Sequence, residues 1–597
     1  MHFGIEDYAL IGDCETAALV SRSGSIDWLC LPRFDSEACF AALLGSPENG
    51  RWQIAPAGKA RVTRRYRPGT LILETQFHTR TGSVTLIDFM PLRKSHPQLI
   101  RLLRCTRGRV RMKTDLAIRF DYGHTIPWVT RESDDTLAAI AGPHLLFHSS
   151  SVPVEGERLH TVSEFVIRKG QTVSWDLQYS DSVQRYRVRT NLKTALGKTE
   201  ADWCKWSCQR TYKGPFAEAL ERSLITLKAL TYAPTGGVLA AATTSLPEEP
   251  GGERNWDYRY CWIRDATFTL LAFIHAGYHR EASRWREWLA RSAAGSPDQL
   301  QVLYGVAGER NQLEWEVPWL SGYRGASPVR VGNAASAQLQ LDIYGELADA
   351  LYQDGHAAHS VLRKNLDFEF GILQTLTKMW RERDHGIWEV RGPERHFTHS
   401  KVMIWVAFDR ILKRFERADI KAPFAEWRTL RDKIHADVCH RGFDTKLNSF
   451  VQYYGSKQAD AALLLIPLVG FLPPSDPRVA GTVRFIEKQL LRNGLVRRYQ
   501  TAKTDDGLRG SEGAFLPCSF WLADNYELLG RHAEAERLLK RLLKLRNDVG
   551  LLSEEYHVEK KCLVGNFPQA FSHVGMVNTI MNIYQARGPA HQRAKRA

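Results

Sequence analysis

The sequence predicts a multidomain β + α protein, in which an N-terminal antiparallel β-sandwich is followed by an all-α domain. The chain has 597 residues, which exceeds the size at which a single hydrophobic core stops growing. The period of its apolar residues also changes near residue 200, from that of strands to that of helices. We expect the β-sandwich over 1–195, a helical linker over 196–212, the α domain over 213–588 and a basic tail over 589–597.

Short β-rich runs separated by turns fill the first part of the chain. TLILETQF (70–77) and SVTLIDFM (83–90) flank the turn sequence HTRTG, and FVIRKGQTVSWDLQY (165–179) repeats this pattern around a glycine. Alternating apolar positions with Gly-bearing turns about every ten residues are typical of antiparallel strands. The pattern therefore predicts a β-sandwich.

Helical spacing dominates after residue 213. One apolar stripe is formed by Ala335, Leu339, Ile343, Leu347 and Leu351. The segment SDPRV predicts the start of another helix, with Asp476 as the cap and Pro477 at the first helical position. If a helix and its connection take about 30 residues, the domain holds about twelve helices, which suits six helical hairpins in a ring.

Composition and charge narrow the possible functions. The apolar fraction of 44% and the charged fraction of 25% are those of an ordinary globular protein. The net charge of +15 is dispersed and no nucleic-acid motif accompanies it, so we expect no nucleic-acid partner. No apolar run reaches about 18 residues, and the N-terminus carries acids where a secretory signal needs a basic start. These features favour a cytoplasmic protein without membrane contact, and the oligomeric state stays open, a homo-oligomer included.

The potential metal ligands are poorly spaced. The ten cysteines are scattered, which favours reduced thiols over a disulfide framework. Cys204 and Cys208 have no second pair at zinc spacing nearby, and His396 and His399 are expected to be hydrogen-bonded or exposed. We therefore predict no metal site.

Four segments combine aromatic side chains with charged groups. They are NWDYRYCWIRDATF (255–268), EWEVPWLSGYRGASPVRVGN (314–333), GIWEVRGPERHFTHSKVMIW (386–405) and LLSEEYHVEKKCLVGNFPQAFSH (551–573). A sugar presents apolar C–H faces ringed by hydroxyls, so its binding site needs flat aromatic walls and fixed hydrogen-bonding groups. These segments indicate a carbohydrate site.

Each charged group in these segments also has a purely structural interpretation. Arg264 and Asp265 could form a surface ion pair at a helix start, and Glu554 could be an acid in a first helical turn. Glu389 could be a rim residue paired to Arg391 or Arg395. Spacing alone does not exclude these interpretations.

Glu389 and Glu554 also suit glycoside hydrolysis, which needs one protonated and one ionised carboxyl group. Trp388 and Val390 flank Glu389, and such an apolar wall favours the protonated form that a general acid requires. Glu554 precedes another acid and a tyrosine, a polar setting in which a carboxylate can hold a water.

In these segments the sequence resembles family 15 of the glycoside hydrolases, which contains glucoamylases and one class of microbial trehalases. GGERNWDYRYCWIRDATF together with LVGNFPQAFSH carries the resemblance. Residues 5–36 resemble the N-terminal β-sandwich of the trehalase-like members, and 213–588 resembles their (α/α)6 barrel. The resemblance implies an inverting mechanism that needs no cofactor.

The resemblance also implies roles for individual residues. Glu389, after Trp388, matches the general acid and Glu554 matches the general base. The matching substrate-binding residues are Tyr258, Trp262, Arg264, Asp265, Trp388 and, in a weaker correspondence, Trp319, Tyr323 and Arg324.

The base segment departs from the family pattern. It has LSEEYHVEKK where family members commonly have an Asp after the Tyr, so His557 and the lysine pair could alter the leaving-group side of the pocket. Glu555 and Glu512 are further candidates for the base.

The predicted function is an inverting, exo-acting α-glucoside hydrolase that releases β-glucose from a small substrate, with trehalose favoured. A glucoamylase acting on α-1,4 malto-oligosaccharides is the alternative. An inverting disaccharide phosphorylase and a non-catalytic sugar-binding protein are lesser alternatives. Inversion would require the two carboxyl groups to lie about 6.5–9.5 Å apart, which leaves room for the attacking water.

Overall fold

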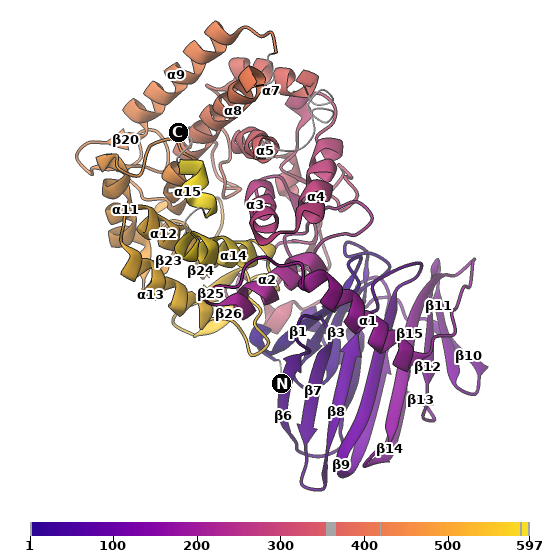
Figure 1. Cartoon of the computed structure of the whole chain (residues 1–597). Helices are drawn as coiled ribbons and strands as arrows, with labels where there is room; N and C mark the ends of the chain where they lie inside the picture. Colours follow the sequence, from indigo (N-terminus) through magenta and orange to yellow (C-terminus); the bar gives the residue numbers. More distant parts are fainter. Residues whose placement is uncertain (1–2, 354–365, 418–419, 586–587, 595–597) are drawn as a thin grey trace.

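The structure, a computed structural model, describes residues 3–353, 366–417, 420–585 and 588–594. A β domain and a ring of helices lie side by side, and the helix α1 (Leu192–Ser207) runs between them (Figure 1). This helix begins at Leu192, before the expected linker of 196–212, because Asn191 caps it by accepting a hydrogen bond from the Thr194 backbone N–H. Its Leu196 packs against a small apolar cluster that includes Ile87 of the β domain.

Two antiparallel sheets share the long strand β9 (Gln98–Ala117). Its first half pairs with β8 (Gly82–Phe89) and β15 (Thr172–Asp181), and its second half pairs with β5 (Arg51–Pro56) and β14 (His160–Arg168). The other strands of this domain are β1 (Tyr8–Gly12), β2 (Ala17–Ser21), β3 (Ser25–Cys30), β4 (Ala38–Phe40), β6 (Arg61–Tyr66), β7 (Leu73–His78), β10 (Trp128–Ser133), β11 (Thr136–Ala141), β12 (His144–Ser150) and β13 (Glu155–Glu157). The predicted antiparallel strands are therefore confirmed.

Aromatic side chains fill the space between the two sheets. Trp52 of one sheet lies 5.4 Å from His148 of the other, and Phe165 lies 6.0 Å from Trp175 across the same layer. Face-to-face packing of this kind buries the apolar face of each sheet, as in a β-sandwich.

Six inner helices form a closed ring. They are α3 (Ala266–Ala276), α5 (Asp342–Tyr352), α8 (Thr398–Arg417), α10 (Leu465–Leu468), α12 (Leu516–Leu528) and α14 (Ala570–Tyr584). Each contacts the next in this order, and α14 returns to contact α3. The outer helix that precedes each inner one is, in the same order, α2 (Ala217–Ala229), α4 (His279–Ser292), α7 (Leu366–Met379), α9 (Phe424–Arg441), α11 (Pro477–Leu490) and α13 (His532–Leu543). The expected (α/α)6 barrel is confirmed (Figure 1).

The helix α5 begins later than the apolar stripe predicts. Ala334–Ala337 form a 3-10 turn, Gln338 is extended, and the α-helix begins only at Asp342. The Leu341 backbone N–H donates to Asp384, and the Gln338 side chain donates to the backbone carbonyl of Glu389. These contacts with a distant loop hold the segment out of the helix.

The C-terminal segment differs from the expected basic tail. Residues Pro589–Ala594 form α15, which contacts α3, α10, α12 and α14 inside the ring. Arg593 is buried, forms an ion pair with Asp349 and lies 5.1 Å over the Phe268 ring. This part of the segment is therefore packed into the barrel.

The β domain braces a loop of the helical domain. Arg259 is fully buried and pairs with Asp257, and its guanidinium also donates to the Tyr122 hydroxyl and the Ser36 carbonyl of the β domain. The loop that precedes α3 is thereby tied to the sandwich. Among the described helices, none combines the length and the apolar character needed to cross a lipid bilayer.

Candidate active site

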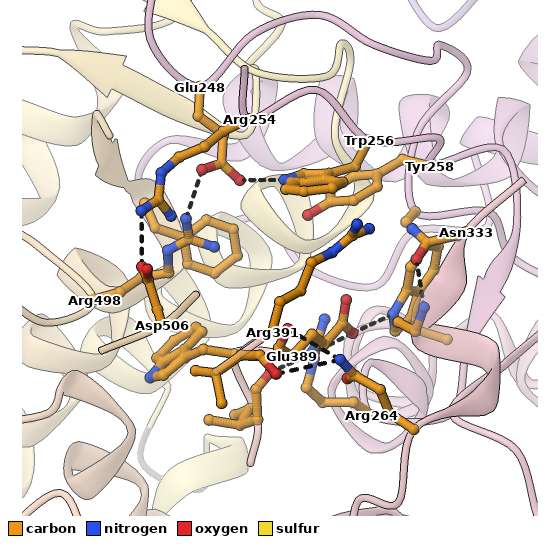
Figure 2. A pocket seen from close by; sticks show the side chains of 18 of the residues that line it. Glu248, Arg254, Trp256, Tyr258, Arg264, Asn333, Glu389, Arg391, Arg498 and Asp506 are labelled. Atoms are coloured by element: carbon orange, nitrogen blue, oxygen red, sulfur yellow. Dashed lines mark hydrogen bonds and ion pairs between the residues drawn. The ribbon is translucent and has the colours of Figure 1, made fainter. Parts of the chain in front are cut away.

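A pocket lies at the N-terminal ends of the inner helices. Its walls come from the loops that lead into α3, α5, α8, α12 and α14 (Figure 2). Six of the predicted residues line it: Tyr258, Trp262, Arg264, Asp265, Trp388 and Glu389. Residues about 130 positions apart in the chain therefore meet in one cavity.

Glu389 occupies a polar part of the pocket. Its Oε1 accepts a hydrogen bond from Trp262 Nε1 at 2.6 Å and from Arg264 Nη1 at 3.1 Å. Trp388 and Val390 line the same pocket, and the Trp388 indole N–H donates to Asp460 at 2.8 Å. Arg391 pairs instead with Glu314, so Glu389 is not its partner. The two donors orient the Glu389 carboxyl through one oxygen, and Oε2 is left for a substrate.

Arg264 and Asp265 do not form a surface ion pair. Their side chains are only 12% and 13% exposed, and Arg264 also donates to the Ile387 carbonyl. Burial raises the pKa of Asp265 to about 6, although the adjacent Arg264 guanidinium opposes this shift. A carboxylate and a guanidinium fixed side by side in a pocket can bind sugar hydroxyls as acceptor and donor.

Glu554 is fully buried and lies just before a strand, not in a helical turn. Its Oε2 accepts a hydrogen bond from the Asn566 backbone N–H at 3.0 Å, whereas its buried Oε1 accepts no hydrogen bond of good geometry, and the nearby Tyr258 hydroxyl lowers the pKa of the carboxyl. A side chain at Gly565 would come within 2.6 Å of Oε2, so the glycine makes room for the acid. Burial and the nearby Glu248 carboxylate raise the pKa of Glu554, against the opposing effect of Arg498.

Tyr258 and Trp262 connect the surroundings of the two acids. Their rings lie 5.2 Å apart, and the Trp262 indole binds Glu389. Burial raises the pKa of Tyr258 well above its usual value, and the charges of Glu554, Glu248 and Glu389 raise it further. Both candidate catalytic acids therefore lie close enough to Tyr258 to influence it electrostatically.

Three of the predicted binding residues, those of the weaker correspondence, are not among the residues that line the pocket. Trp319 donates to the Tyr122 carbonyl at 3.1 Å and stands 38% exposed. The Tyr323 hydroxyl donates to the Phe3 carbonyl, and Arg324 lies over the Tyr323 ring. Their loop packs on the β domain, a partner that spacing in the sequence did not indicate.

Sequence reasoning missed one side of the pocket. Glu248, Arg254, Arg498 and Asp506 line it opposite Glu389 and Arg264 (Figure 2). Arg498 donates to Glu248 at 2.9 Å, and Arg254 donates to Asp506 at 2.8 Å. Glu248 lies three positions before the first glycine of the GGERNWDY motif, which contains Arg254, and Arg498 and Asp506 lie in a long charged loop. Those two signals could have indicated them.

Within the described parts of the chain, one group of side chains has the spacing of metal ligands. Carboxylate oxygens of Glu248, Glu554 and Glu555 lie within 4.8 Å of one another. Arg498 already contacts Glu248 at 2.9 Å and Glu555 at 3.4 Å. Its guanidinium therefore supplies a positive charge to this group of acids in the place of a metal ion. His399 is not part of the group, and burial lowers its pKa to about 3.

Comparison with known proteins identifies the family. The model of glycosyl hydrolases family 15 matches residues 214–581, and that of the trehalase-like N-terminal domain matches residues 2–171. This chain belongs to glycosyl hydrolase family 15. The family 15 enzyme is thus a glycoside hydrolase with a carbohydrate substrate, as the resemblance implied.

Relatives of this family 15 enzyme cover nearly its whole length. A trehalase of Mycobacterium tuberculosis is 38% identical over 621 residues, which cover 98% of this chain and 90% of that protein. A trehalase of Thermoplasma volcanium is 34% identical and covers 98% and 94% of the two chains. The crystal structure of a bacterial glucoamylase with acarbose has a TM-score of 0.73 at 12% identity, and covers 97% of this chain and 94% of its own. This last similarity shows the common fold.

Proposed function

We propose that this enzyme hydrolyses trehalose with inversion, with Glu389 as general acid and Glu554 as general base. The observation that supports the assignment is the buried Oε1 of Glu554, to which no described backbone group donates a hydrogen bond, combined with a Glu389 carboxyl held by donors on one oxygen only. A base needs a free oxygen for the attacking water, and an acid needs a free oxygen for the leaving group.

The chemistry follows from these positions. Glu389 Oε2 gives its proton to the glycosidic oxygen while Glu554 Oε1 takes a proton from a water that attacks the anomeric carbon. Trp262 and Arg264 keep the Glu389 carboxyl oriented. Arg264 and Asp265 would bind hydroxyls of the terminal glucose, since they lie beside the acid in the same pocket.

The charge of the pocket supports a neutral substrate. Its lining includes four acids, Glu248, Asp265, Glu389 and Asp506, and four arginines, Arg254, Arg264, Arg391 and Arg498. Each arginine is paired with an acid, so none is left over for an anionic substrate. The relatives named trehalase favour trehalose among the neutral α-glucosides.

The test is a substrate panel of trehalose, maltose, maltotriose, isomaltose and soluble starch, read as free glucose. We expect trehalose to be the best substrate. Higher kcat/KM on maltotriose and starch would instead favour a glucoamylase. Release of glucose 1-phosphate, only when phosphate is present, would favour a phosphorylase.

Proton NMR of the first products tests the stereochemistry. Inversion at one anomeric carbon of trehalose must give one β-glucose and, from the leaving group, one α-glucose. Early formation of α-glucose alone would refute inversion. Glu389→Gln and Glu554→Gln should each lower kcat by about 10²- to 10⁴-fold.

The cytoplasmic location stays a prediction, and so does the possibility that the protein forms a homo-oligomer. Size-exclusion chromatography with light scattering would measure the latter.

A further inference from the structure

A cluster of acids surrounds the proposed base. Glu248, Glu554 and Glu555 are all buried, and one oxygen of each lies within 4.8 Å of the others. Glu512 and Asp506 are buried beside them, on the far side of two arginines. A single glutamate would suffice as a base, so the number of acids needs an explanation.

The cluster cannot be fully ionised. Arg498 contacts Glu248, Glu512 and Glu555, and Arg254 contacts Asp506 and Glu512. Five buried carboxyl groups therefore face two guanidinium groups. An excess of three negative charges without water would cost far more than protonating some of the acids. The cluster must hold protons.

Hydrogen-bond donors reach three of these acids. Trp256 Nε1 donates to Glu248 Oε1 at 3.1 Å, and Arg498 Nη2 donates to Glu248 Oε2 at 2.9 Å. Glu512 receives two hydrogen bonds from Arg498, at 3.1 and 2.6 Å. Asp506 accepts from Arg254 and from the Tyr499 hydroxyl. Donors on their oxygens stabilise the charged form of these three acids.

Glu555 has no such support. Both of its oxygens are buried without a hydrogen-bond donor, and its nearest cation, Arg498, is 3.4 Å away. The groups that act on it are Glu248, Arg498, Glu512 and Glu554, three of which are acids. A neutral carboxyl group needs no donor, and it offers one O–H of its own.

We infer that Glu555 is a positioning residue that stays protonated at neutral pH and so adds no charge beside Glu248 and Glu554, which allows Glu554 to ionise as the base. This inference rests on the proposed function of Glu554. Glu248 has the opposite effect and disfavours ionisation of the base, since its charge lies nearby and raises the pKa of Glu554. Burial and the neighbouring acids likewise raise the pKa of Glu555.

Two substitutions separate these roles in the pH dependence of kcat/KM. Glu555→Gln replaces a neutral carboxyl by a neutral amide of the same shape, so we expect the acidic limb to stay at the same pH. Glu248→Gln removes a charge near the base, so we expect the acidic limb to move to lower pH by about one unit. A shift of the Glu555→Gln limb as large as that of Glu248→Gln would overturn the inference, because it would show that Glu555 is ionised.

Infrared spectroscopy tests the proton directly and does not depend on activity. The difference spectrum between wild type and Glu555→Gln at neutral pH should contain the C=O band of a buried protonated carboxyl group. Glu512→Gln is the matched control, because Arg498 donates two hydrogen bonds to that buried acid, and its difference spectrum should lack the band. Absence of the band for Glu555→Gln would refute the inference.

Two further measurements keep the outcomes distinct. If a Glu555→Gln protein fails to fold by circular dichroism, Glu555→Met supplies the same infrared comparison. Binding of Mn²⁺ to the wild type that is lost in Glu555→Gln would also overturn the inference, because a cation would require an ionised Glu555. Full activity of Glu554→Gln, in contrast, would reject the proposed base while leaving the infrared result valid.

Discussion

Replacing Trp262 by phenylalanine should remove one of the two hydrogen bonds that orient the Glu389 carboxyl. The indole donates to Oε1 at 2.6 Å, and Arg264 donates to the same oxygen at 3.1 Å. A hydrogen bond to a carboxylate contributes about 1.5–3 kcal/mol to the stability of that arrangement. Its loss lets the carboxyl rotate, so Oε2 would face the glycosidic oxygen for a smaller fraction of the time.

The expected result for Trp262→Phe is a fall in kcat of about 10- to 150-fold, which is this energy converted into a rate. The ring is retained, so KM should change by less than about threefold. Initial rates of glucose release from trehalose, measured over a range of concentrations, separate the two constants.

Trp388→Phe is the matched control. It also loses an indole donor in the pocket, but that donor binds Asp460 at 2.8 Å and not Glu389. We expect its kcat to stay within about fivefold of wild type. A kcat of Trp262→Phe within about twofold of wild type would refute the orienting role. An equal loss in both variants would show a general disturbance of the pocket.

Three further predictions follow from particular contacts. Trp319→Ala should leave kcat/KM within about twofold, because the side chain contacts the β domain and not the pocket. Arg391→Ala should raise the KM for trehalose about fivefold, because the guanidinium lies 4.3 Å over the ring of Trp256, which also lines the pocket, a contact of about 1 kcal/mol. Arg593→Met should lower the free energy of unfolding by about 3 kcal/mol, measured by urea titration, because it removes a buried partner of Asp349. The arginine partners hold the pKa of Asp349 at about 2, below its usual value of 3.8. The ion pair therefore stabilises the fold fully above pH 3.8, and this stabilisation is lost as the pH falls toward 2.

Each of these predictions has a contradicting result. A tenfold lower kcat/KM of Trp319→Ala would return that residue to the substrate site. An unchanged KM with a lower kcat in Arg391→Ala would assign it to the transition state. A stability difference for Arg593→Met that does not shrink in acid would show that packing of α15, and not the ion pair, is responsible.

Local pattern in the sequence determined the elements of this protein. The change of period near residue 200 predicted strands and then helices, because alternation and 3.6-residue spacing reflect which side chains face a core. Asp476 caps α11 as expected, since its side chain accepts a hydrogen bond from the Arg478 N–H two residues on. Glu389 and Glu554 could be selected because each lies in a short motif.

Only the tertiary structure decided what surrounds these acids. The apolar neighbours of Glu389 in sequence predicted a dry acid, but its contacts are Trp262 and Arg264, more than 120 positions earlier. Glu248 and Arg498, 250 positions apart, form the opposite wall of the pocket. Arg593 looked like part of a frayed tail, yet it is buried. Hydrogen bonds and ion pairs between distant residues depend on how loops and domains meet, and no local spacing encodes that meeting.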